Sequence, residues 1–248
     1  LEKLQEAQTT YVGEKVDQEE LQKELNKQKA NLSNQKVAKA NLLAVTKGDE
    51  KKYQQLLADA KAQLAAFKRF VSGQGGASIL NGTTKDDSGW GKYYNQRDSL
   101  WGNRPLGISN ISVADAGCLV TSMAMIMTYY GKSVSPGDIA ANSTYFSPYD
   151  PYADFKQGNL TINGSNTNRT RVGYNQSSLD TELSSGKPVI LGVSPYGSTK
   201  PEHFIVVKSK DGSDYTINDP FIENGMNTKF SSHYSISSIR TVDRVTVN

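Results

Sequence analysis

The chain has 248 residues, with 28 Lys and Arg against 25 Asp and Glu and a formal net charge of +3. That charge is far from the basic surface of a nucleic-acid-binding protein, so we expect no nucleic acid among its partners. A single cysteine excludes an intrachain disulfide, and with only two histidines beside it we expect no metal site. No apolar run in the sequence approaches the ~18 residues that cross a membrane.

Residues 1–72 have the periodicity of long helices, with no proline and only two glycines. Apolar residues recur at the a and d spacing of a heptad, which is typical of a coiled-coil seam. They are Leu4, Ala7, Tyr11, Leu21, Leu25, Leu32 and Leu42. Polar residues also fall on this seam, at Glu14, Gln18, Gln28 and Gln35.

A turn and a second helix follow the first one. Lys47-Gly48-Asp49-Glu50 combines a helix stop with an N-cap and an acidic first turn. Apolar residues then alternate at spacings of four and three, at Tyr53, Leu57, Ala60, Leu64, Phe67 and Val71. We therefore predict that residues 1–72 form an antiparallel coiled-coil hairpin. The far end of its longer first helix would either pair with another copy, giving a dimer, or continue into further sequence.

The composition changes after this predicted hairpin. Residues 73–89 are rich in Gly, Ser, Thr and Asp, which predicts a flexible linker. A second domain is expected over residues 90–248. All 8 prolines and both tryptophans lie in this part of the chain, and the first tryptophan, Trp90, marks its predicted start.

Within residues 90–248 the predicted helices come first and most strands follow. A helix should begin at Cys118 and end at Gly131, with short helices near residues 135–140 and 177–185 and an irregular loop over residues 143–159. Predicted strands cover residues 188–193, 203–208, 215–217 and 239–247, with a hairpin turn at residues 210–214. This order indicates an α+β domain in which the cysteine helix packs on an antiparallel sheet.

Cys118 is expected at the N-terminus of a buried helix. The free N–H groups and the helix dipole there favour a thiolate over a thiol. Gly117 precedes it, where a turn needs a residue without a side chain. A free cysteine is also often simply a buried core residue, so its position alone leaves both interpretations open.

A thiol nucleophile needs a base and a third group that orients the base. His203 begins one predicted strand, and Asp219 ends the strand that the 210–214 turn pairs with it, so a hairpin would bring them together. Alone, His203 could be a structural histidine and Asp219 a turn-forming Asp-Pro residue. His233 is the competing base, but it lies in a polar stretch with no strand to hold it. Together, Cys118, His203 and Asp219 form the constellation that a cysteine peptidase needs.

The tetrahedral intermediate of such a reaction also needs hydrogen-bond donors for its oxyanion. The backbone N–H of Cys118 is one predicted donor. The side-chain amide of Gln96, upstream of the cysteine, is the other. A glutamine alone is more often a surface residue, although two tyrosines before it and Trp101 after it indicate an ordered segment.

Several segments of residues 90–248 resemble the papain-like cysteine peptidases related to the bacteriocin leader-processing, double-glycine family. They are residues 93–98, 117–125, 129–131, 186–190, 203–207 and 218–220. The resemblance implies that Cys118 is the nucleophile, His203 the base and Asp219 its orienting group, with Gln96 completing the oxyanion hole. We also assign Gly117, Trp101 and Glu202 to substrate binding, and we expect no cofactor.

The first domain has a resemblance of its own. Residues 53–64 are similar to the end of coiled-coil segments that precede the catalytic domains of secreted bacterial peptidoglycan hydrolases. This resemblance implies a place outside a bacterial cell, and docking of residues 1–46 on a membrane division complex or another protein that controls the enzyme. The chain begins at Leu1 with no signal peptide, so we expect a mature or trimmed chain whose targeting segment is missing.

The predicted function is that of a secreted cysteine peptidase that cleaves peptide bonds in bacterial cell-wall peptides or surface proteins. One alternative is a degenerate, non-catalytic peptidase fold that binds a partner and is presented on an interaction arm. The intact Cys118, His203, Asp219 and Gln96 argue against it. Another alternative is leader-peptide processing within a transporter, but the sequence lacks the membrane spans that a transporter needs. A free-standing enzyme that processes leader peptides is still an open alternative.

Overall fold

A computed structural model describes residues 2–46, 49–147 and 155–248. Part of the predicted 47–50 turn and part of the predicted 143–159 loop lie outside these residues. The helices are α1 (Glu2–Thr46), α2 (Glu50–Gly73), α3 (Val113–Ala116), α4 (Cys118–Tyr129), α5 (Pro136–Ala141) and α6 (Gln176–Ser184). The strands are β1 (Lys85–Asp86), β2 (Lys92–Tyr93), β3 (Gly158–Ile162), β4 (Ser165–Gly173), β5 (Val189–Val193), β6 (His203–Asp211), β7 (Asp214–Asn218), β8 (Thr228–Lys229) and β9 (Ile239–Val247).

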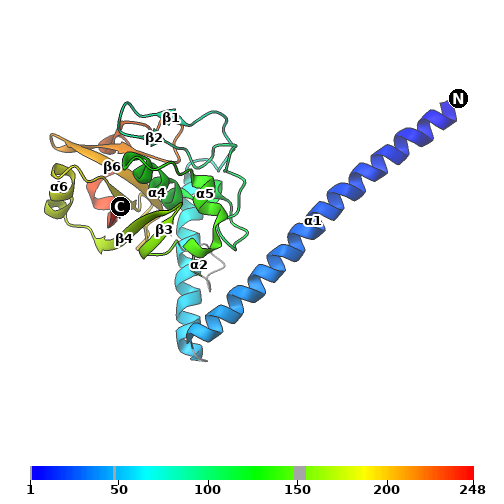
Figure 1. The fold of residues 1–248 in the computed structure, drawn as a ribbon, viewed down its shortest axis with the longest axis horizontal. Helices are drawn as coiled ribbons and strands as arrows, with labels where there is room; N and C mark the ends of the chain where they lie inside the picture. Colours follow the sequence, from blue (N-terminus) through cyan, green and yellow to red (C-terminus); the bar gives the residue numbers. More distant parts are fainter. Residues whose placement is uncertain (1, 47–48, 148–154) are drawn as a thin grey trace.

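The two long helices do not pair along their length. Figure 1 shows α1 leaving the end of α2 at an angle and running away from the rest of the molecule. The described apolar residues of its heptad seam, Tyr11, Leu21, Leu25 and Leu32, are exposed. The predicted antiparallel coiled-coil hairpin is therefore not confirmed.

The apolar face of α2 explains why the hairpin does not close. Its buried residues are Ala66, Phe67 and Phe70, and both phenylalanines belong to the core clusters of the second domain. An amphipathic helix has one such face, so a face that packs on the domain is not available to α1. The polar residues in the seam of α1 weaken its side of the pairing as well.

The composition predicts a flexible linker over residues 73–89, but Gly73 is the last residue of α2 and residues 74–89 are bonded to the second domain at several points. The backbone N–H and the hydroxyl of Thr83 both donate to Asp98, at 2.9 and 2.5 Å. Asp87 is buried and accepts hydrogen bonds from Lys208 at 2.6 Å and Asn218 at 2.9 Å. The polar side chains that led to the prediction of a flexible linker thus form buried hydrogen bonds with the second domain, and these bonds order the segment.

The second domain is built on a seven-stranded sheet of order β3-β4-β9-β5-β6-β7-β8, in which every neighbouring pair is antiparallel. Strand β9 has the predicted bounds, and β5, β6 and β7 overlap the predicted strands. Strands β3 and β4 were not predicted, because Asn, Thr, Ser and Arg dominate their sequence. The backbone hydrogen bonds between β4 and β9 stabilise β4 in spite of its low apolar content.

Helices cover both faces of this sheet, so the predicted α+β architecture is confirmed for the second domain. Phe204 and Val206 of β6 share a core cluster with the residues of α4, whereas Ile205 and Val207 share another with Leu179 of α6. Neighbouring strand residues point to opposite faces, and this alternation places α4 and α6 on opposite sides. None of the helices in the described part of the chain is long and apolar enough to cross a membrane.

The helix ends follow local chemistry. Helix α4 stops near Gly131 as predicted: this glycine takes a left-handed φ of 75°, and the N–H of Lys132 donates to the carbonyl of Met127. Helix α6 starts two residues earlier than a cap at Ser177 predicts. Its cap is Asn175, whose side chain accepts a hydrogen bond from the N–H of Ser178 at 2.9 Å.

Candidate active site

Cys118 is the first residue of α4, as the sequence predicts, and its thiol is free and buried. Gly117 before it has a φ of −85°, which any residue adopts. A Cβ atom at Gly117 would lie 2.5 Å from the carbonyl oxygen of Val113, so the glycine is required by close packing. This tight junction between α3 and α4 places Cys118 where the N–H groups of the helix have no intrahelical partners.

His203 and Asp219 lie together at one end of the β6–β7 hairpin. His203 opens β6, and Asp219 directly follows β7. The Nε2 atom of His203 is 2.8 Å from Oδ1 of Asp219, and both side chains are buried. Because Asp219 occupies Nε2, the Nδ1 atom is left free to face Cys118, which lies close enough to the ring to affect its pKa. The structure thus brings the three predicted residues into one contiguous group.

Burial and charge oppose each other at this pair. Burial by itself lowers the pKa of His203, but the Asp219 carboxylate and the neighbouring Cys118 outweigh it and raise this pKa to about 9. Burial raises the pKa of Asp219, but His203 and the hydrogen-bond donors around the carboxylate outweigh it, so the pKa is lowered. At neutral pH the arrangement therefore favours a protonated imidazole beside an ionised carboxylate.

Asp219 is held by further donors. The backbone N–H of Phe221 donates to Oδ1 at 2.8 Å, and the hydroxyl of Tyr234 donates to Oδ2 at 2.5 Å. Tyr234 is a site residue that the sequence analysis missed, since no pattern distinguishes it from other tyrosines. The one available signal was its place beside His233, the competing base.

His233 lies away from this group. Its side chain is exposed, and its Nε2 atom is 3.0 Å from the hydroxyl of Thr228. The structure therefore places His203, and not His233, next to Cys118.

Gln96 is buried in the segment between β2 and α3. Its amide nitrogen donates to the carbonyl of Ala114 at 2.8 Å, and its backbone N–H donates to the carbonyl of Pro220. Its Oε1 atom is buried without a hydrogen-bond partner. Gln96 therefore connects Pro220, which follows Asp219, with helix α3, which leads into Cys118. The second N–H of its side-chain amide forms no hydrogen bond with the described residues of the protein.

The residues predicted to bind substrate lie in different surroundings. Trp101 is a core residue whose indole N–H donates to the carbonyl of Asn95 at 2.8 Å. Glu202 is buried next to His203, and its Oε2 atom accepts the N–H of Tyr196 at 2.7 Å. Its Oε1 atom has no hydrogen-bond partner and lies 3.7 Å from Nε of Arg69 in α2.

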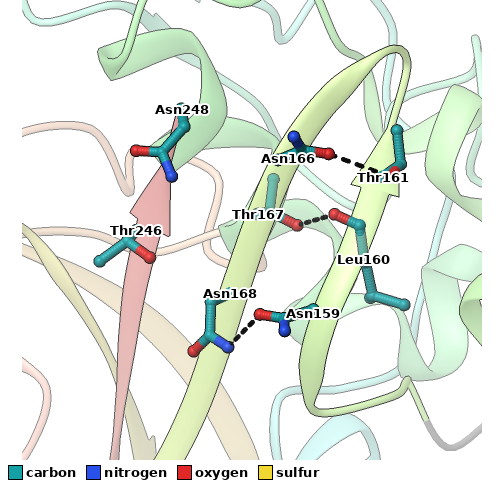
Figure 2. Close-up of a pocket in the computed structure, with 8 residues that line it drawn as sticks. All are labelled: Asn159, Leu160, Thr161, Asn166, Thr167, Asn168, Thr246 and Asn248. Carbon is teal, nitrogen blue, oxygen red and sulfur yellow. Dashed lines mark hydrogen bonds between the residues drawn. The ribbon is translucent and has the colours of Figure 1, made fainter.

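A separate hollow of about 390 Å³ lies at the β3–β4 edge of the sheet. Figure 2 shows that hydroxyl and amide side chains from β3, β4 and the end of the chain line it, together with Leu160. Several of these side chains bond to one another, such as Asn168 to Asn159 at 2.6 Å. The hollow contains none of the candidate catalytic residues, so it is not the site of the proposed chemistry.

The segment that carries these residues matches a known protein family. A family model described as the Peptidase_C39 like family matches residues 91–238, which is more than half of the chain. The chain belongs to this family. The C39-like domain is therefore supported as a cysteine peptidase at the level of the family, in agreement with the resemblance found in its sequence.

The family match covers the second domain only. A search of the curated proteins finds no match to the chain. The residues matched to the C39-like family do not include α1 or α2, so the fusion to a helical arm is not addressed by the match. Within the described residues, no group of three or more His, Cys, Asp or Glu side chains could hold a metal ion.

Proposed function

We propose that the C39-like domain is a cysteine peptidase that acts through Cys118, His203 and Asp219. The observation that carries this proposal is the buried hydrogen bond between His203 and Asp219, with Cys118 at the start of α4 close to the same imidazole. A nucleophile, a base and an orienting group in this order are what acyl transfer by a thiol requires.

In the proposed reaction, the Cys118 thiolate attacks the carbonyl carbon of a peptide bond and forms a carbon–sulfur bond. The oxyanion accepts hydrogen bonds from the backbone N–H of Cys118 and from the Gln96 amide. His203 then gives its proton to the leaving amine as the carbon–nitrogen bond breaks, which leaves a thioester. His203 next takes a proton from water as the resulting hydroxide attacks the thioester, and the carbon–sulfur bond breaks to release the acid product and restore the Cys118 thiolate beside the protonated imidazole.

We further propose that Glu202 binds a cationic group of the substrate. Its Oε1 atom is a buried carboxylate oxygen without a hydrogen-bond partner, one residue from the base. Burying such an oxygen costs free energy unless a donor reaches it, and Nε of Arg69 lies 3.7 Å from it here. A peptide with an amine or guanidinium near the cleaved bond would supply that donor. Gly117 would contribute to the same cleft through its backbone, and Trp101 by supporting the segment that carries Gln96.

The proposed setting is the outside of a bacterial cell, with cell-wall peptides or surface proteins as substrates. This part of the proposal rests on the likeness of residues 53–64 to the arms of secreted peptidoglycan hydrolases. The exposed apolar residues of α1 suit contact with a protein partner, such as a membrane division complex, or with a second copy of the chain. A non-catalytic binding module is not favoured, because the buried His203–Asp219 pair has no evident use in such a protein.

The proposal is tested by digestion of purified peptidoglycan and of a denatured-protein mixture with the wild-type chain and with Cys118→Ala. We expect new peptide termini in at least one of the two digests with wild type and none with Cys118→Ala. Mass spectrometry of the chain mixed with a cleaved peptide should show an acyl adduct on Cys118. Equal products from both proteins would refute the assignment of the nucleophile.

A further inference from the structure

The group around Cys118 is closed off from solvent. Cys118 is 2% exposed and His203 is 1% exposed. Attack on a carbonyl requires the reacting atoms to come within about 3–3.5 Å. The substrate carbonyl has to come that close to the sulfur and the imidazole, so a segment that covers either of them has to move before the proposed reaction can begin.

Helix α2 is a segment that covers His203. The ring of Phe70 stacks on the imidazole with centroids 4.0 Å apart and planes 5° from parallel. The same ring meets Phe221 edge-on at 5.3 Å, and Phe67, one turn earlier, meets Phe204 at 6.0 Å. Helix α2 also contacts α3, which leads into Cys118. Figure 1 shows the upper part of α2 running alongside the second domain.

Polar contacts attach α2 to the loop of residues 194–202, which ends directly before His203. The amide of Gln63 donates to the carbonyl of Pro201 at 2.8 Å. The Asp59 carboxylate, one turn earlier, is 3.0 Å from Nζ of Lys200. These contacts lie on the helix face that continues to Phe70, so the whole C-terminal half of α2 is aligned over the site.

The attachment has features of a reversible contact. The Asp59–Lys200 pair is partly exposed, and such pairs stabilise a contact only slightly. Gly75 and Gly76 follow α2 with φ values of 85° and 104°, and no atom lies within 4 Å of where their Cβ atoms would be. These two glycines give the chain freedom to turn between α2 and the domain. Helix α2 also precedes the residues matched to the C39-like family.

We propose that the C-terminal half of α2 is an autoinhibitory element that occupies the substrate cleft and has to leave it before a peptide can reach Cys118. Phe70 covers the base, and Arg69 takes the position at Glu202 that a substrate cation would fill. This inference rests on the proposed function of Cys118 and His203. It adds that the wild-type chain is held mostly in a closed form, so it cleaves substrate more slowly than a chain in which α2 has left the site.

The test uses the full chain and two matched charge reversals on α2. Arg69→Glu places a carboxylate beside the buried carboxylate of Glu202 and should push the helix away. Lys68→Glu makes the same change of charge on an exposed neighbour. For each protein we would measure the rate at which iodoacetamide alkylates Cys118 and the rate at which a soluble peptide mixture is cleaved.

We expect Arg69→Glu to be alkylated roughly tenfold faster than wild type or more, because the new carboxylate replaces a cation beside the buried carboxylate of Glu202 and repels it. Lys68→Glu should stay within about twofold of wild type, as surface substitutions usually do. Circular dichroism spectra should show that each variant is folded.

A second pair of variants keeps the test decisive if Arg69→Glu fails to fold. Asp59→Lys should raise the alkylation rate by about two- to fivefold, since it breaks an exposed ion pair and adds repulsion. The double variant Asp59→Lys with Lys200→Asp should return the rate to that of wild type.

The outcomes separate this inference from the proposed function. Autoinhibition is overturned if wild-type Cys118 is alkylated as fast as in the denatured chain, or if Arg69→Glu is alkylated no faster than wild type. If alkylation accelerates as expected but no protein cleaves any substrate, α2 covers the site and the proposed peptidase function fails. If wild type and folded Arg69→Glu cleave the peptides at the same rate, and Cys118 is alkylated at the same rate in both, the proposed peptidase function stands and the autoinhibition is overturned.

Discussion

The ring of Phe70 lies flat on the imidazole of His203, with ring centroids 4.0 Å apart. This contact joins a helix from the start of the chain to the candidate base. It also keeps water from one face of the His203–Asp219 pair, whose charges interact more strongly in a dry environment. The behaviour of this pair can be tested through stability, activity and pH.

The raised pKa of His203 predicts a loss of stability at alkaline pH. An unfolded histidine titrates near 6.5 and the folded one near 9, so the contribution to the free energy of unfolding is complete below about pH 6.5. It decreases as the pH rises through about 9, by on the order of 3 kcal/mol in total. Asp219, whose pKa is lowered, stays ionised throughout this range.

Urea unfolding between about pH 6 and pH 9.5 measures this dependence. The wild-type free energy of unfolding should fall with pH more steeply than that of His203→Gln, which cannot take up the proton. Parallel curves for the two proteins would show that His203 does not retain a raised pKa in the folded chain.

The two histidines should differ sharply in their effect on turnover. His203→Ala should remove nearly all activity, since this ring contacts both Asp219 and Cys118. His233→Ala should leave most of it, because His233 is exposed and bonded to Thr228. Initial rates on one soluble peptide decide between them, and full activity in His203→Ala would overturn the assignment of the base.

Tyr234 is predicted to support Asp219 without touching substrate. Tyr234→Phe removes the donor to Oδ2 and leaves a buried carboxylate oxygen short of one hydrogen bond, at a cost of about 1–3 kcal/mol. The free energy of unfolding in urea should fall by that amount. Activity should fall less than in Asp219→Ala, which loses the orienting group entirely. A variant as stable as wild type would show that this hydrogen bond contributes little.

Gln96 is predicted to act on the oxyanion. Gln96→Ala should lower kcat on the order of 10²-fold and leave KM almost unchanged, as loss of one oxyanion donor does. Steady-state kinetics on a soluble peptide separate the two parameters. A change confined to KM would instead assign Gln96 to binding of the ground-state substrate.

Asp87 tests whether residues 74–89 are part of the folded domain. Asp87→Ala removes the buried partner of Lys208 and should lower the free energy of unfolding by about 3–5 kcal/mol. Asp86→Ala is the matched control, because Asp86 is exposed and pairs with Lys92 at the surface, and it should change stability by less than about 1 kcal/mol. If both substitutions changed the free energy of unfolding by the same small amount, residues 74–89 would be better described as a flexible linker.

Local patterns in the sequence determined much of the second domain. The glycine past α4, the alternation in β9 and the turn between β6 and β7 are signals that a few neighbouring residues carry by themselves. That turn also explains why Asp219 could be placed near His203 in advance, since a tight hairpin fixes the register beside its turn, and the bulge between Val207 and Ser209 shifts it by only one residue. The order of helix and strands likewise predicted the α+β class.

The tertiary structure alone decided which surfaces meet. Heptad spacing shows that α2 has an apolar face, but the same spacing serves a partner helix or a domain surface equally well, and here Phe67 and Phe70 pack on the domain. Tyr234 reaches Asp219 through the packing of the whole chain, and no local periodicity encodes such a contact. The burial of Cys118 beneath neighbouring elements follows from the same long-range packing, in which the competition between possible partners is settled by total buried area and hydrogen bonding.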